Sequence, residues 1–168
     1  GQGSQGQGGR GRRGGISQPV GFDKLSLKGR ALRLLAGREH SRAELEKKLA
    51  THEETPGELQ RALDELQAKG FISEQRVVES LIHRRAARLG AGRVKQELQA
   101  KGISAEAVAE AVDRLRGTET DRAREVWRKK FGEPAADAAG RAKQMRFLAA
   151  RGFGAEAIRR VVRGGEDD

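Results

Sequence analysis

The sequence LQAKGF at residues 66–71 returns as LQAKGI at residues 98–103 and, in a variant form, as LAARGF at residues 148–153. Each copy places a lysine or arginine before a glycine, and an apolar residue directly after it. A cation is favourable at the negative end of a helix dipole, and glycine adopts the left-handed conformation that ends many helices. The apolar residue is expected to fold back onto the last turn. Helix ends are therefore predicted at these three glycines and at one more that follows a helical run: Gly70, Gly102, Gly152 and Gly117.

Two of the three endings occupy the same position in a longer repeat. When Leu49, Leu98 and Leu148 are aligned, the residues ten and fourteen positions further on are aliphatic in every copy. They are Leu59, Val108 and Ile158, followed by Leu63, Val112 and Val162. Four positions upstream stand Leu45 and Val94, whereas the third copy has Gln144 beside the apolar Met145. The offsets predict a unit of about fifty residues, in which LQAKGI and LAARGF end the second helix and LQAKGF ends a third helix.

A short amphipathic helix is predicted ahead of each of these helix pairs. Its apolar markers are Leu34 with Leu35, Leu81 with Ile82, and Val126 with Trp127. Apolar residues recur at spacings of three and four along the whole pattern, and no stretch alternates as a strand would. The sequence therefore predicts an all-α fold, an elongated, curved array of three tandem three-helix repeats. The predicted repeats span residues 23–70, 71–117 and 118–164, between a disordered Gly/Gln/Arg-rich tail at 1–22 and an acidic tail at 165–168.

Two polar pairs predict helix starts. Ser41 with Glu44, and Thr118 with Asp121, have the spacing of a capping box, in which each residue of the pair satisfies a backbone N–H of the other.

Composition excludes several classes of protein. The chain has no cysteine, so disulfides, thiol catalysis and sulfur-ligated zinc sites are excluded. Its three histidines, His40, His52 and His83, lack the spacing of a helical metal pair, and a lone surface position is expected for each. No phosphate loop or nucleophile elbow occurs. We therefore expect no enzyme, no cofactor and no metal. Apolar runs fall short of the roughly twenty residues that cross a bilayer, and a cytoplasmic monomer is expected.

The formal net charge of +10 is unevenly distributed. Cations and anions cancel between residues 30 and 70, whereas residues 76–103 hold seven cations and two anions, and residues 141–163 hold seven cations and one anion. Stacked repeats would present this excess as one basic band, suited to a phosphate backbone or an acidic groove. The predicted binding residues are Arg84, Arg85, Arg88, Arg93, Lys95, Lys101, Arg141, Lys143, Arg146 and Arg151.

Three motifs, in this order and spacing, resemble the RecX family of regulators of the bacterial recombinase RecA. They are ALRLLAGREHSRAELEKKL with KGFISEQRV, then RRAARLGAGRVKQELQAKGIS, and finally KQMRFLAARGFGAEAI. The likeness runs from about Leu25 to Arg163. It departs in VVESLIHRR, where the family tends to have aromatic residues and this chain has Val77, Val78 and Leu81.

The resemblance implies that this protein is a non-enzymatic partner of RecA. It would be a curved helical array that lies in the groove of the RecA filament on single-stranded DNA. RecX proteins block strand exchange, ATP hydrolysis and the coprotease activity that cleaves LexA, and they favour filament disassembly. A weak direct contact with single- or double-stranded DNA is compatible with the same basic band.

Two other functions fit the residues. A three-helix unit with a glycine-containing turn also resembles a helix-turn-helix regulator that acts directly on duplex DNA. Against this alternative, the cations are spread over several helices and are not gathered on one recognition helix. A repeat scaffold for another acidic protein is compatible with the charge pattern alone.

Overall fold

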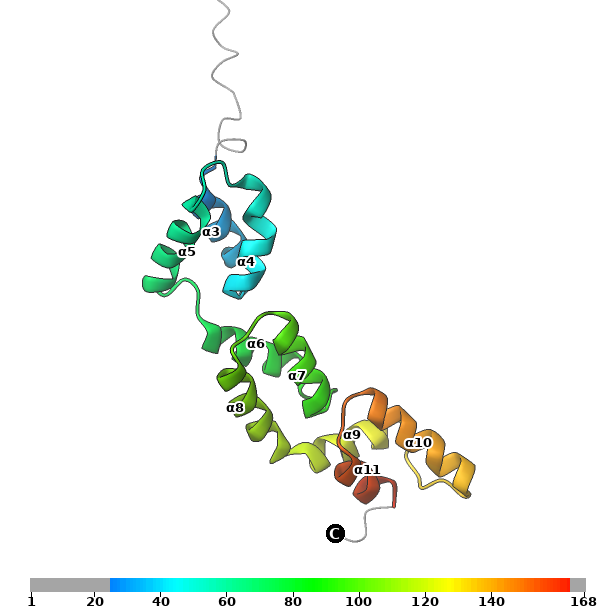
Figure 1. Cartoon of the computed structure of the whole chain (residues 1–168). Coiled ribbons are helices and arrows are strands. Elements are labelled where there is room, and N and C mark those ends of the chain that lie inside the picture. The colour runs from blue at the N-terminus through cyan, green and yellow to red at the C-terminus, as the bar shows by residue number, and fades with distance from the viewer. Residues whose placement is uncertain (1–24, 164–168) are drawn as a thin grey trace, which may run out of the picture.

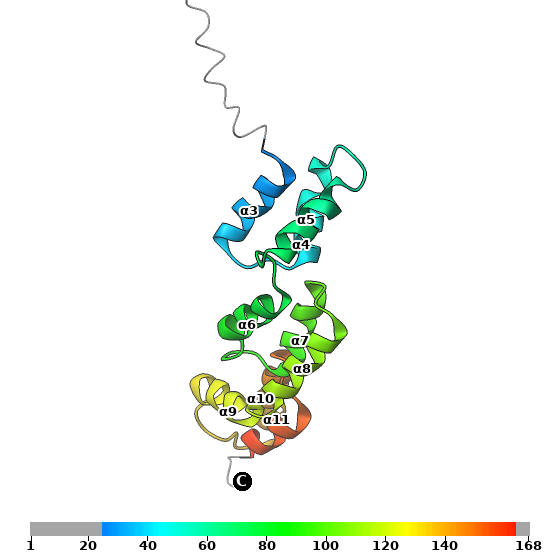
Figure 2. The same cartoon turned by 90° about the vertical axis from the view of Figure 1, so that its left-hand side faces the viewer.

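The computed structural model describes residues 25–163, and within this range the chain forms nine α-helices and no β-strand. They are α3 (Leu27–Gly37), α4 (Arg42–Leu49), α5 (Glu58–Ala68), α6 (Glu74–Arg85), α7 (Ala91–Ala100), α8 (Ala105–Arg116), α9 (Glu119–Lys130), α10 (Ala138–Ala150) and α11 (Ala155–Val162). A single 3-10 turn, η1 (Ala50–His52), follows α4. Figures 1 and 2 show the helices grouped three by three along one long axis. The predicted all-α array of three-helix repeats is confirmed.

Each group of three helices encloses its own apolar cluster. Repeat one (α3–α5), repeat two (α6–α8) and repeat three (α9–α11) have separate clusters of buried side chains. The aligned residues Leu49, Leu98 and Leu148 are 3%, 0% and 0% exposed. All six aliphatic residues placed ten and fourteen positions further on are buried as well. The repeat register read from the sequence is therefore the register of the three cores.

The limits of the repeats remain predictions. The tail proposed for residues 1–22 and the acidic tail proposed for 165–168 lie outside the residues that the structure describes. In repeat two, Val77, Val78 and Leu81 are buried in the core, at the place where the resembling family tends to have aromatic rings.

Three of the four predicted glycine endings are confirmed. Gly70, Gly102 and Gly152 have φ of +85°, +75° and +89°. A left-handed helix end was also predicted at Gly117, and this prediction is wrong, because the φ of Gly117 is −65°. Only Gly117 and Thr118 separate α8 from α9, so the chain passes from one helix to the next without a left-handed turn.

The apolar residue after the glycine folds back in two copies and not in the third. Ile103 and Phe153 are buried, but Phe71 is 46% exposed and Ile72 enters the core of repeat one instead. The prediction for Phe71 is therefore wrong. LQAKGF ends the last helix of its repeat, so the chain leaves the repeat there to reach α6.

One of the two predicted capping boxes forms. Ser41 Oγ accepts the N–H of Glu44 at 3.0 Å, and Glu44 Oε1 accepts the N–H of Ser41 at 2.9 Å. Thr118 makes no side-chain cap, so the prediction for Thr118 and Asp121 is wrong. The Thr118 hydroxyl donates to the Leu115 carbonyl and accepts from Arg122 Nε, which leaves it unavailable to the first turn of α9.

The polar residue in the third copy of the register is buried, as are its aliphatic equivalents. Gln144 is 6% exposed. Its Oε1 accepts the indole N–H of Trp127 at 2.9 Å, and its amide donates to the Glu133 carbonyl at 3.1 Å. A buried amide is tolerated when its hydrogen bonds are made, so Gln144 joins the loop after α9 to the core of repeat three.

Candidate functional site

The junction between repeats two and three gathers cations around one aromatic ring. We call this cleft the two–three groove; its principal lining residues are Arg85, Arg88, Arg93, Phe147 and Arg151. The Arg151 guanidinium lies 4.6 Å from the centre of the Phe147 ring, and the Lys130 ammonium lies 5.4 Å from it. Phe131 packs edge-on against Phe147, with the ring centres 5.3 Å apart. The aromatic pair thus supports a positively charged rim.

A second open cleft, the one–two groove, lies between repeats one and two and has a volume of about 820 Å³. Its cations are Arg38, Lys47, Lys48, Arg84, Arg85 and Lys101. Two carboxylates, Glu44 and Glu97, also line it. Arg85 lines both clefts, so the two grooves adjoin at this residue, and we call them together the basic face.

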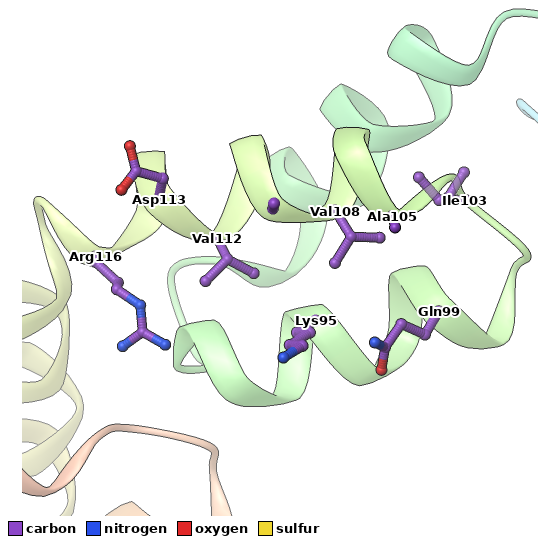
Figure 3. Close-up of a pocket in the computed structure, with 9 residues that line it drawn as sticks. Lys95, Gln99, Ile103, Ala105, Val108, Val112, Asp113 and Arg116 are labelled. Atoms are coloured by element: carbon purple, nitrogen blue, oxygen red, sulfur yellow. The ribbon is translucent and has the colours of Figure 1, made fainter.

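Six of the ten residues predicted from the charge pattern lie along this face. They are Arg84, Arg85, Arg88, Arg93, Lys101 and Arg151. Lys95 lies elsewhere, in a shallow groove between α7 and α8 that also has Gln99, Val108 and Arg116 on its walls (Figure 3).

The other three predicted residues, Arg141, Lys143 and Arg146, are exposed on α10 and line neither groove. Lys143 precedes Phe147 by four positions and so extends the same side of α10. Arg146 precedes it by one position, which turns its side chain about 100° around the helix. The structure therefore divides the predicted band among several faces.

Several cations of the face had not been predicted. Lys47 and Lys48 belong to repeat one, whose summed charge is close to zero and therefore concealed them. Lys129 and Lys130 continue the two–three groove along α9. A count by helix face would have found the first pair, because Lys47 and Lys48 follow Glu44 by three and four positions and share its side of α4.

Glu44 ties repeat one to repeat two. Its Oε2 accepts from Arg38 at 3.0 Å and from Lys101 Nζ at 3.1 Å, across the one–two groove. Nearby, Ser41 Oγ donates to the Lys101 carbonyl at 2.6 Å. Burial by itself would raise the pKa of Glu44, but the hydrogen bonds from the Ser41 backbone, Arg38 and Lys101 lower it from 4.5 to about 2.

Acid is expected to reduce the contribution of Glu44 to stability. A carboxylate whose pKa is lowered on folding stabilises the protein above the unfolded pKa and loses this contribution as pH falls through the folded value. The window is thus pH 4.5 to about 2, and the contribution at neutral pH is up to about 3 kcal/mol. Urea unfolding should show that Glu44→Gln destabilises the protein about half as much at pH 3 as at pH 7. An equal loss at both pH values would contradict this prediction.

The histidines differ from one another. His52 and His83 are exposed as predicted, whereas His40 is only 3% exposed, so the prediction of a surface position is wrong for it. Its Nδ1 lies 3.0 Å from the Arg38 carbonyl, and burial lowers its pKa. Within residues 25–163, no group of three or more His, Asp or Glu side chains is arranged to hold a metal ion. No helix in this range is both long and apolar enough to span a membrane.

Comparison with known proteins matches each repeat separately. Family profiles described as the first, second and third three-helix domains of RecX match residues 28–66, 73–112 and 118–162. The chain belongs to the RecX family.

The sequences of individual RecX proteins are similar to this chain over most of its length. The chain is 56% identical to the regulatory protein RecX of Leptothrix cholodnii, over 83% of this chain and 89% of the relative. It is 46% identical to that of Ralstonia nicotianae, over 84% and 89%. The crystal structure of RecX from Lactobacillus salivarius has the same fold, with a TM-score of 0.69 at 18% identity, over 83% of this chain and 94% of that one.

In this RecX chain, glycines of the second and third repeats meet backbone to backbone. The N–H of Gly90 donates to the Arg151 carbonyl at 2.8 Å, and the N–H of Gly92 donates to the Gly152 carbonyl at 3.0 Å. A Cβ added to Gly90 would lie 2.4 Å from the Gly152 carbonyl. These glycines therefore allow the close packing of the two repeats.

A buried acid completes the same junction. Helices α7 and α11 have glycine N-caps, which offer no side-chain acceptor. Glu119, which is 6% exposed, accepts the N–H of Ala91 at 2.9 Å and that of Gly154 at 2.6 Å, and so caps both helices. Arg122 donates to the carbonyls of Ala86 and Leu89 across the junction. The cations of repeats two and three thus converge because their backbones are joined.

Proposed function

We propose that this RecX-family chain acts in the cytoplasm as a negative regulator of RecA. It binds in the groove of the RecA filament on single-stranded DNA, inhibits strand exchange, ATP hydrolysis and LexA cleavage, and promotes filament disassembly. The observation that carries the proposal is the basic face formed by the adjoining one–two and two–three grooves, which share Arg85.

The elongated arrangement supports this function physically. Three repeats in a row offer several weak contacts to a repeating partner, and linked contacts multiply in affinity without any new chemistry. A monomer would suffice, because each repeat supplies its own core. The cations of the face come from α4, α6, α7 and α9, from the ends of α3, α7 and α10, and from the loop after α6. No single helix carries them, which favours a filament groove over insertion of one recognition helix into duplex DNA.

The test is the ATPase rate of RecA on single-stranded DNA at substoichiometric amounts of this protein. We expect the wild type to lower the ATPase rate even when it is present at well below one molecule per RecA protomer. Reversal of three charges of the two–three groove, in Arg88→Glu/Arg93→Glu/Arg151→Glu, is expected to reduce inhibition at least about tenfold, since electrostatic complementarity supports both encounter and binding.

A matched triple variant tests whether inhibition depends on the position of the reversed charges or only on the total charge of the protein. Lys95→Glu, Arg116→Glu and Arg159→Glu reverse the same number of charges away from the basic face, and we expect this variant to inhibit nearly as well as the wild type. Equal loss in both variants, at unchanged helicity, would remove the basic face from the mechanism. No inhibition by the wild type, together with sequence-dependent binding of duplex DNA, would favour the helix-turn-helix alternative.

A further inference from the structure

The one–two groove already contains an acid at the place where an anionic ligand would bind. Six cations and two carboxylates line it, which leaves a formal excess of four positive charges. Glu97 pairs with Arg85 through two hydrogen bonds, of 3.1 and 2.8 Å, within repeat two. Glu44 differs, because it comes from repeat one and accepts from Lys101 of repeat two.

Glu44 also holds two cations of the groove. Arg38 and Lys101 both donate to the same oxygen, Oε2, while Oε1 accepts the N–H of Ser41. The capping bond therefore uses one oxygen and the groove cations use the other. A ligand oxygen could replace Oε2 without disturbing the start of α4.

The junction around this acid is polar. Each apolar cluster of the described residues belongs to a single repeat, and none joins repeat one to repeat two. The polar contacts between the repeats are Glu44 with Lys101, Ser41 with Lys101, and Arg76, whose Nε donates to Glu39 at 2.9 Å. Beside them, Ala43 of repeat one lies close to Gly102 of repeat two. The Arg76–Glu39 pair is half-exposed and contributes little. The Glu44 and Lys101 side chains are only 16% and 20% exposed, so a ligand that displaces Glu44 has to replace its hydrogen bonds to the groove cations.

We propose that the one–two groove binds the phosphodiester backbone of a nucleic acid, and that Glu44 is an internal competitor whose Oε2 is displaced by a phosphate oxygen. Arg38 and Lys101 then donate to the phosphate, and Lys47 and Lys48, which are exposed along the same groove, add further contacts. This inference rests on the proposed function, because it names the chemistry met by one part of the basic face.

The distribution of cations along the basic face favours a nucleic acid over an acidic protein as the ligand. Cations continue from the one–two groove through Arg85 into the two–three groove. A polyanion with evenly spaced charges contacts such a line along its length, and release of its counterions drives binding. The aromatic rings of the face lie under cations and against one another, so the contact would be with the backbone and would not read the bases.

The experiment measures binding of a fluorescent single-stranded oligonucleotide by anisotropy, in the absence of RecA. Glu44→Gln keeps a capping acceptor and removes the competing charge, and we expect it to bind about three- to tenfold more tightly than the wild type. The matched control is Glu39→Gln, which makes the same change in net charge and also releases a cation of repeat two, Arg76, outside the groove. We expect this control to change affinity by less than about twofold.

A second variant does not depend on the stability of the capping box. Lys47→Gln/Lys48→Gln removes two exposed groove cations, and we expect weaker binding with a salt dependence reduced by about 1.4 in slope, or about 0.7 per lost phosphate contact. An equal gain in Glu44→Gln and Glu39→Gln, or an unchanged salt slope in the lysine variant, would overturn the proposal. Tighter binding of polyglutamate but not of the oligonucleotide by Glu44→Gln would also overturn it and assign the groove to an acidic protein.

RecA inhibition is measured on the same proteins in parallel. If the wild type does not inhibit RecA, the proposed function fails, whatever the oligonucleotide result. If the wild type inhibits RecA and the Glu44→Gln gain is absent, only the proposal for the one–two groove fails.

Discussion

Replacing Gly152 by alanine is expected to lower the free energy of unfolding by at least about 4 kcal/mol and to separate repeats two and three. Gly152 has φ of +89°, and an added Cβ would lie 2.4 Å from the backbone nitrogen of Arg93. Backbone atoms at that distance have to move apart, which would break the hydrogen bonds of Gly90 and Gly92 to the loop of Arg151 and Gly152. Urea unfolding of the two proteins measures the difference.

Gly70→Ala is the matched control for this substitution. Gly70 has nearly the same φ, +85°, but nothing lies within 4 Å of an added Cβ. Its substitution carries only the cost of a left-handed alanine, about 1–2 kcal/mol. If Gly152→Ala and Gly70→Ala lose the same stability, the close approach of the two repeats is not important for the fold.

Replacing Glu119 by alanine is expected to cost about 3–5 kcal/mol, the loss typical of breaking a buried charged pair. Two backbone N–H groups, those of Ala91 and Gly154, would lose their acceptor. Arg122, whose side chain is 14% exposed, would lose the nearby carboxylate, 3.6 Å away. Urea unfolding measures the loss, and amide hydrogen exchange at the starts of α7 and α11 should show faster exchange in both repeats together.

Two further variants give this prediction its controls. Glu125→Ala removes an ion pair with Arg128 from the exposed surface of the same helix, and we expect almost no change in stability. Glu119→Gln keeps one acceptor oxygen and is expected to fall between the two alanine variants. The capping role of Glu119 would be contradicted if Glu119→Ala and Glu125→Ala behaved alike.

Both junction variants also bear on the proposed function. The two–three groove takes Arg88 and Arg93 from repeat two and Arg151 from repeat three, so its geometry depends on the contact between the repeats. Inhibition of RecA should therefore decline in Gly152→Ala and Glu119→Ala while the helical content of each repeat persists. The Gly70→Ala control is expected to retain inhibition.

The cores and most helix ends could be predicted because their signals are local or periodic. Leu98 and Leu148 recur in one register, and the structure buries both. Positive φ at Gly102 and Gly152 follows from the chemistry of helix ends. The same reasoning was wrong at Gly117, where the next helix begins almost at once.

The candidate site was predicted only in part, because a sum of charges along the chain does not distinguish helix faces. Lys47 and Lys48 lie on the basic face although their repeat is neutral, and Lys95 lies away from it although its segment is strongly basic. His40 appeared to be an ordinary polar residue, and only the folded structure shows that it is buried.

The sequence by itself determined the helices, the repeat, the three cores and the resemblance to the RecX family, since these depend on residue type and on spacings within about fifty residues. The tertiary structure decided how the repeats are joined: a backbone contact at Gly90 and Gly152, a shared cap from Glu119, and a polar bridge through Glu44. These contacts join atoms about thirty to sixty residues apart in the chain. No periodic pattern encodes them, because each is made once, between surfaces that exist only after the helices have packed.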